Sequence, residues 1–184
     1  MHSIAIPRPL HDVFGLRQSR GALALILIAG VTLPVALALA SPTALVDVPL
    51  WRAVLALVLI ADIAAGAVAN FTAGTNDHYA ERPGSRWLFI AVHLHLVVVA
   101  LLLDAPLLPA VVLWAATIAG AVVVNLLAGR ALQRPVGGLV LAAILTAIPL
   151  LATPPLLAAV GAVFALKVVY AFAVDHRPTE SRIA

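Results

Sequence analysis

Residues 51–71 read WRAVLALVLIADIAAGAVANF, and only Arg52 and Asp62 carry charge in this stretch. A helix of about 20 apolar residues crosses the roughly 30 Å hydrocarbon core of a bilayer, so the stretch predicts a transmembrane helix. Five other stretches of similar length and composition predict further spans, at residues 21–40, 86–104, 108–129, 136–152 and 155–174. The sequence therefore predicts six transmembrane helices.

The composition of the whole chain also indicates a membrane protein. Of its 184 residues, 64% are hydrophobic and 10% are charged, whereas about a quarter of the residues in a soluble domain are charged. Continuous apolar runs exclude a membrane β-barrel, whose strands alternate between lipid-facing and lumen-facing residues. We expect an all-α, polytopic membrane fold with a cytoplasmic N-terminal segment at 1–20, a six-helix transmembrane domain at 21–174 and a cytoplasmic C-terminal tail at 175–184.

The arginines predict the orientation of the chain. The loops of one side hold Arg52 alone, while the termini and the loops of the other side hold Arg8, Arg17, Arg20, Arg82, Arg86, Arg130, Arg134, Arg177 and Arg182. Because basic residues stay in the cytoplasm, both termini are expected there, in a multi-pass protein of the inner (plasma) membrane. The arginines lie in short turns without interleaved aromatic residues, so no nucleic-acid partner is expected. The excess of arginine over lysine favours a prokaryotic source with a GC-rich genome.

Two stretches of the chain are similar to each other. Residues 61–74 read ADIAAGAVANFTAG and residues 116–129 read ATIAGAVVVNLLAG, and seven of the fourteen positions agree. Asn70 aligns with Asn125, and an Arg-Pro pair follows each stretch before the next span. The match indicates a parallel repeat of helical hairpins, spans 2–3 and spans 4–5. Chance is the alternative, because alanine, valine and glycine are common throughout the chain.

Four ionisable side chains lie at membrane depth, away from the ends of the predicted spans: Asp62, His93, His95 and Lys167. A charge in such a position costs about 2.5 to 3.5 kcal/mol. At 1.5 Å per residue, Asp62 lies about 16 Å and Lys167 about 18 Å from the outer boundary, so we expect them to form an ion pair. The pair is either a static contact between spans 2 and 6 or a proton- or cation-coupled site that opens during turnover. A third alternative is an unpaired Lys167 that extends toward the cytoplasm.

His93 and His95 are separated by about 200° around a continuous helix. At most one of them can then face the interior, and we expect it to be His93. No other predicted span contains a histidine, so a pair of opposed haem ligands is not expected. A retinal Schiff base on Lys167 is not expected either, because aromatic residues make up only 5% of the chain.

Spans 2 and 4 each carry a stripe of small and polar residues spaced four apart. The stripe on span 2 is Asp62, Gly66 and Asn70, and the stripe on span 4 is Thr117, Ala121, Asn125 and Gly129. Small residues allow close approach of helix backbones, and amides hydrogen-bond across that approach, so both stripes are expected to face the bundle interior. Asn70 and Asn125 lie near the cytoplasmic ends of their spans and are candidates for the mouth of a pocket.

The most polar stretch, FTAGTNDHYAERP at 71–83, is predicted to be a long cytoplasmic loop. A turn needs only a few residues, so this loop is a candidate binding or catalytic mouth. Asp77 and His78 are candidate acid–base residues together with His93, and Arg82 or Arg86 is a candidate partner for an anionic head group. The candidate substrate-binding residues are Asp62, Asn70, Asn76, Tyr79, Arg82, His93, Asn125, Lys167 and Tyr170.

Three functions are compatible with these features. The first is a small transporter or carrier in which Asp62 and Lys167 couple or gate solute movement. The second is an inner-leaflet enzyme acting on a lipid or isoprenoid substrate, with Asp77, His78 and His93 as its catalytic residues. The third is a non-catalytic membrane assembly subunit. The expected partners are the lipid bilayer and a small-molecule or lipid ligand, with a homo-oligomer as a further alternative. No motif identifies a cofactor, and no metal site is expected.

Overall fold

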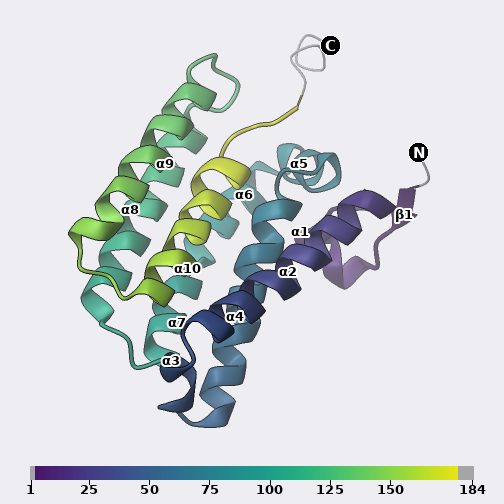
Figure 1. The fold of residues 1–184 in the computed structure, drawn as a ribbon. Helices are drawn as coiled ribbons and strands as arrows, with labels where there is room; N and C mark the ends of the chain where they lie inside the picture. Colours follow the sequence, from purple (N-terminus) through teal and green to yellow (C-terminus); the bar gives the residue numbers. More distant parts are fainter. Residues whose placement is uncertain (1–2, 178–184) are drawn as a thin grey trace.

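The computed structural model describes residues 3–177 and forms a bundle of helices (Figure 1). The segments long and apolar enough to cross a membrane are α2 (Arg20–Ala40), α4 (Leu50–Ala69), α6 (Pro83–Val92) with α7 (His95–Leu102), α8 (Leu107–Leu126), α9 (Gln133–Leu150), and α10 (Pro155–Ala165) with η2 (Leu166–Phe172). A short helix, α3 (Thr43–Val46), lies between α2 and α4. The six apolar segments among the described residues indicate a multi-pass membrane protein.

Prolines determine where several spans begin. Pro49, Pro106 and Pro154 immediately precede α4, α8 and α10, and Pro83 is the first residue of α6. The first amides of a helix have no partner within it, so a proline there removes no hydrogen bond. The breaks in the apolar pattern therefore fall at these residues.

The last span, α10 with η2, lies at the centre of the bundle. It packs against α4, α7, α8 and α9, and 61% of its residues are buried. Phe164 and Val168 on this span are completely buried. By contrast, α2 runs along one side of the bundle against α4, and only 11% of its apolar stretch is buried (Figure 1). Lys167 is thus carried by the most enclosed span.

Two spans depart from regular α-helix. The third span is interrupted between α6 and α7, where His93 has a ψ of 72°, and Trp114 Nε1 donates to the freed carbonyl of His93 at 2.9 Å. The sixth span changes at Leu166 into a π-helix, and at its end the Ala173 amide donates to the Val168 carbonyl, five residues back, at 3.1 Å. π-Helical turns are frequent at functional sites.

Residues 3–19 form a small hairpin at one end of the bundle. Strand β1 (Ser3–Ala5) pairs antiparallel with β2 (Arg17–Ser19), and η1 (Arg8–Leu10) and α1 (His11–Phe14) lie between them. Gln18 is buried, and its Nε2 donates to Thr72 Oγ1 at 2.6 Å and to the Phe14 carbonyl at 2.8 Å. The bond to Thr72 attaches the hairpin to the start of α5 (Ala73–Ala80). The fold is therefore mostly, but not entirely, helical.

The prediction of a long loop at 71–83 is wrong, because residues Ala73–Ala80 form α5. Thr72 caps this helix by accepting the Thr75 amide at 3.5 Å. The stretch lacks an apolar periodicity, and a helix this short is not stable alone. Its stability comes from packing against α1 and α6, which the local sequence does not reveal.

Gly15 is the residue on which the docking of the hairpin depends. Its φ of 71° and ψ of −172° belong to a region that only glycine adopts readily, and a Cβ there would overlap with the backbone of Gly74. We predict that Gly15→Ala loosens residues 3–19 and speeds trypsin cleavage at Arg17 by about tenfold. Gly129→Ala is the control, because Gly129 also has a positive φ, 78°, but has open space around it. An unchanged cleavage rate in Gly15→Ala would show that the hairpin does not need this close approach.

Candidate functional site

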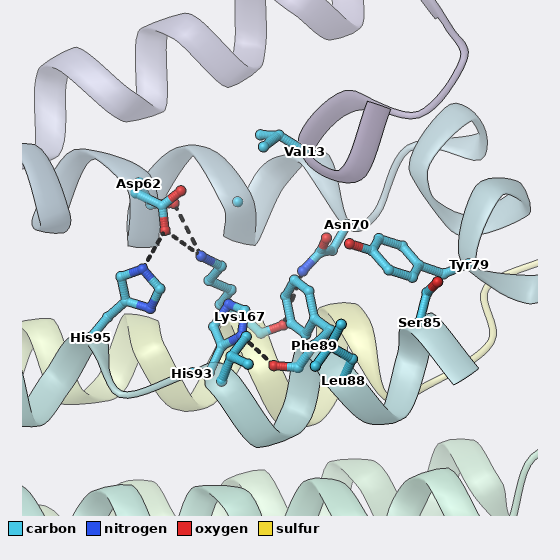
Figure 2. Close-up of a pocket in the computed structure, with 12 residues that line it drawn as sticks. Val13, Asp62, Asn70, Tyr79, Ser85, Leu88, Phe89, His93, His95 and Lys167 are labelled. Atoms are coloured by element: carbon cyan, nitrogen blue, oxygen red, sulfur yellow. Dashed lines mark hydrogen bonds and ion pairs between the residues drawn. The ribbon is translucent and has the colours of Figure 1, made fainter. Parts of the chain in front are cut away.

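A cavity of about 270 Å³ lies between α4, α6 and η2 (Figure 2). Its polar lining residues are Asp62, Asn70, Tyr79, Ser85, His93, His95 and Lys167, and the others are Val13, Gly66, Leu88, Phe89 and Val92. The four ionisable residues predicted at membrane depth, Asp62, His93, His95 and Lys167, therefore line the same cavity. This concentration of charge in an apolar bundle makes the cavity the candidate functional site.

Asp62 and Lys167 are in direct contact at the wall of the cavity. Lys167 Nζ donates to Asp62 Oδ2 at 2.7 Å and to the Asp62 carbonyl at 3.4 Å. Each residue lies twelve positions after the start of its span, at Leu50 and Pro155, or about 18 Å along it. The side chain of Lys167 is 4% exposed and that of Asp62 is 39% exposed. The expected contact is present, and the carboxylate stays open to the cavity.

Both histidines lie beside this ion pair. His95 Nε2 is 3.5 Å from Asp62 Oδ2, and the ring centres of His93 and His95 are 5.0 Å apart. The expectation that only one of them faces the interior is wrong. It assumed a continuous helix, but the helix is interrupted at His93 and Leu94, so the two side chains are no longer turned apart.

His93 is held against α6 by its own ring. Its Nδ1 lies 2.5 Å from the Phe89 carbonyl oxygen, and its ring centre is 3.7 Å from that of Phe89. A carbonyl only accepts, so Nδ1 must carry the proton, and in the neutral ring Nε2 is then the acceptor. The ring is therefore fixed in one tautomer that can accept a hydrogen bond.

One face of α4 is shaped to receive Lys167. A Cβ at Gly66 would overlap with Cε of Lys167 and lie 2.8 Å from its Nζ. One turn further on, Asn70 Nδ2 donates to the Lys167 carbonyl at 3.4 Å. Asp62 thus binds the ammonium group, Gly66 leaves room for it, and Asn70 holds the backbone, as expected of a small and polar stripe that faces the interior.

Of the candidates at 71–83, Tyr79 alone lines this cavity. Asp77 is exposed and His78 is buried, and both line a separate cavity beside β2. Arg82 Nη1 lies 2.8 Å from His78 Nδ1. Asn76 is buried, and within residues 3–177 its Oδ1 has no hydrogen-bond partner. The structure therefore does not bring His78 and His93 to one cavity.

Asn125 and Tyr170 also lie outside the main cavity. Asn125 Oδ1 accepts from Arg86 Nε at 3.0 Å and lines a second cavity. The ring of Tyr170 is 6.3 Å from that of Phe71 and 5.6 Å from that of His176. Burial lowers the pKa of His176, so this imidazole is neutral near pH 7. Asn70 and Asn125, which align in the internal similarity, thus line two different cavities.

Most of the apolar wall of the cavity was not predicted from the sequence. Phe89 and Val92 lie on one face of α6 with the polar Ser85, and the predicted span, which began at residue 86, left Ser85 out. Val13 gave no signal, because it reaches the cavity from the N-terminal hairpin. Within the described part of the chain, no group of three or more histidine, aspartate or glutamate side chains is placed to hold a metal ion.

We predict that Gly66→Ala displaces the Lys167 ammonium group and destabilises the protein. Overpacking of this kind costs about 1 to 3 kcal/mol, which lowers the midpoint of thermal unfolding by several degrees, measured by circular dichroism in detergent. Gly84→Ala is the matched control, because Gly84 lies in α6 with no atom within 4 Å of the position of a Cβ. Equal midpoints for the two variants would rule out the tight passage of Lys167 past α4.

Comparison of the chain with protein-family models, with curated proteins and with solved structures finds no match. The function is therefore inferred from the geometry of the site.

Proposed function

We propose that this protein is a small membrane carrier that binds a small polar solute beside Asp62 and couples the movement of a charged solute to a proton. The observation that carries the proposal is the group of four ionisable side chains around one cavity in the helical spans. Lys167 Nζ lies 2.7 Å and His95 Nε2 lies 3.5 Å from the same oxygen of Asp62. Ionisable residues at membrane depth commonly mark substrate, ion or proton pathways.

Electrical neutrality connects the solute to the proton. The Asp62–Lys167 pair has no net charge, and an added unpaired charge in an apolar surrounding is costly. An anion that binds Lys167 therefore requires Asp62 to take up a proton. A cation that binds Asp62 requires a proton to leave, and a zwitterion requires neither. The charge of the solute thus sets the direction of proton coupling.

The two histidines provide a route for that proton. His95 is the group next to the carboxylate, and His93 follows it at a ring separation of 5.0 Å. Imidazole both accepts and donates protons near neutral pH. In this scheme a proton passes through the histidines to Asp62 when Lys167 turns to the solute.

We also propose an orientation of the chain in the membrane. The start of α2 and the end of η2 lie at the same end of the bundle (Figure 1), as an even number of spans requires. We propose that this arginine-rich end faces the cytoplasm. The similarity of residues 61–74 and 116–129 supports a parallel repeat of helical hairpins, an arrangement that some carriers use.

The alternative of an inner-leaflet lipid enzyme has less support. Its candidate catalytic residues, His78 and His93, line different cavities, and His78 is in contact with Arg82. A purely structural subunit does not account for four ionisable groups around a cavity, because each of them carries a cost in the membrane. The carrier explains both the cavity and its charges.

Transport into proteoliposomes tests the proposal. Vesicles with a trapped pH-sensitive dye receive inward gradients of gluconate, choline or glycine, which represent anionic, cationic and zwitterionic solutes. We expect the wild-type protein to move at least one of these probes, with a change of internal pH if that probe is the anion or the cation. Asp62→Asn should slow this movement by roughly tenfold or more, equivalent to about 1.4 kcal/mol.

Asp104→Asn is the matched control. Asp104 also forms an ion pair, with Arg52 Nη2 at 2.6 Å from its Oδ1, but its side chain is 67% exposed and lies outside the cavity. An exposed pair contributes little, so transport by this variant should equal that of the wild type. Equal rates for Asp62→Asn and the wild type, or no movement of any probe, would reject the carrier.

A further inference from the structure

A second cavity, of about 640 Å³, lies between α6, α8 and the chain that follows η2. Its walls include the side chains of Arg86, Trp87, Asn125, Leu126, Asp175 and Arg177. The cavity is at the arginine-rich end of the bundle, where the spans end. The carrier proposed above does not use it.

Arg86 is a buried cation whose bonds go to neutral groups. It is 8% exposed, and its Nε donates to Asn125 Oδ1 at 3.0 Å. Its Nη2 donates to the carbonyls of Phe172 and Ala173 at 3.2 and 3.1 Å. Within residues 3–177 its Nη1 has no hydrogen-bond partner, and no carboxylate lies within ion-pair distance. A buried charge of this kind favours an anionic ligand.

Arg177 supplies a second cation to the same cavity. Asp175 Oδ2 accepts from its Nη2 at 2.9 Å, and Asp175 Oδ1 accepts from its backbone amide at 2.9 Å. The side-chain bond to Asp175 raises the pKa of Arg177, and no bond to its Nη1 occurs in the described part of the chain. Arg134 Nη2 reaches the carbonyl of Asp175 at 3.2 Å. The lining of this cavity thus holds two guanidinium groups and one carboxylate, which leaves a net positive charge.

We infer that this cavity binds the phosphate group of an anionic phospholipid. Guanidinium groups match the oxygens of a phosphate with paired donors, and basic pockets between transmembrane helices bind lipid head groups. The apolar rim favours a lipid as the source of the phosphate. Trp87 is 41% exposed and Leu126 is 64% exposed beside the two arginines, and tryptophan is enriched at the membrane interface. The head group contacts Arg86 and Arg177 while the acyl chains follow α6 and α8.

Arg177→Gln is the informative variant. Replacement of Arg86 would also remove the hydrogen bonds that join α6 to α8 and η2. The side chain of Arg177 is 35% exposed and, among the described residues, makes no bond between spans. Arg130→Gln is the matched control, because Arg130 is an exposed arginine at the same end of the bundle that does not line the cavity. Both variants remove one positive charge.

The measurement is the midpoint of thermal unfolding of delipidated full-length protein in a non-ionic detergent. Palmitoyl-oleoyl phosphatidylglycerol, the phosphatidylcholine with the same chains, and inorganic phosphate are titrated separately. At about a hundredfold excess over Kd, we expect phosphatidylglycerol to raise the midpoint by roughly 5 to 10 °C in the wild type and in Arg130→Gln. Arg177→Gln should bind about tenfold more weakly.

The three titrations separate the sources of the phosphate. Protection by phosphatidylglycerol alone supports the lipid, and equal protection by inorganic phosphate overturns the lipid in favour of a soluble phosphate. Equal protection by phosphatidylcholine overturns the selectivity for an anion. Equal responses of Arg177→Gln and Arg130→Gln, or no protection by any of the three, overturn the site itself.

Discussion

A charge in the middle of an apolar span needs a partner, and the contact between Asp62 and Lys167 meets that need. The contact joins α4 to the π-helical part of the central span, so it fixes two helices that are far apart in the sequence. Gly66 leaves room for the lysine, which passes close to α4. The same contact leaves Asp62 at the wall of the cavity, because one side of its carboxylate binds the ammonium group and the other side faces the cavity.

The π-helix η2 is held by side chains near both of its ends. Asn70 donates to the Lys167 carbonyl, and Arg86 donates to the Phe172 and Ala173 carbonyls while its own Nε is bound by Asn125. A π-helix lacks the regular i to i−4 bonds, so these side chains stabilise it. The two asparagines that align in the internal similarity thus both support η2, Asn70 directly and Asn125 through Arg86.

The sequence was sufficient for the spans and for the main contact of the site. Long apolar runs have only one structural solution in a membrane, and matching depth made Lys167 the economical partner of Asp62. The position of His95 was not predictable, because the helix is interrupted at His93, where the carbonyl accepts from Trp114 of another span. Helix α5 was missed for a similar reason, since the N-terminal hairpin, and not a local apolar pattern, stabilises it.

A double-mutant cycle on unfolding free energy measures the Asp62–Lys167 contact most directly. The wild type, Asp62→Asn, Lys167→Met and the double variant are compared by unfolding in a denaturing detergent. Each single change leaves a charge or a polar group without its partner and should cost about 3 kcal/mol. The double variant should cost at least about 2 kcal/mol less than the sum of the single changes. Additive costs would mean that the two side chains do not interact in the folded protein.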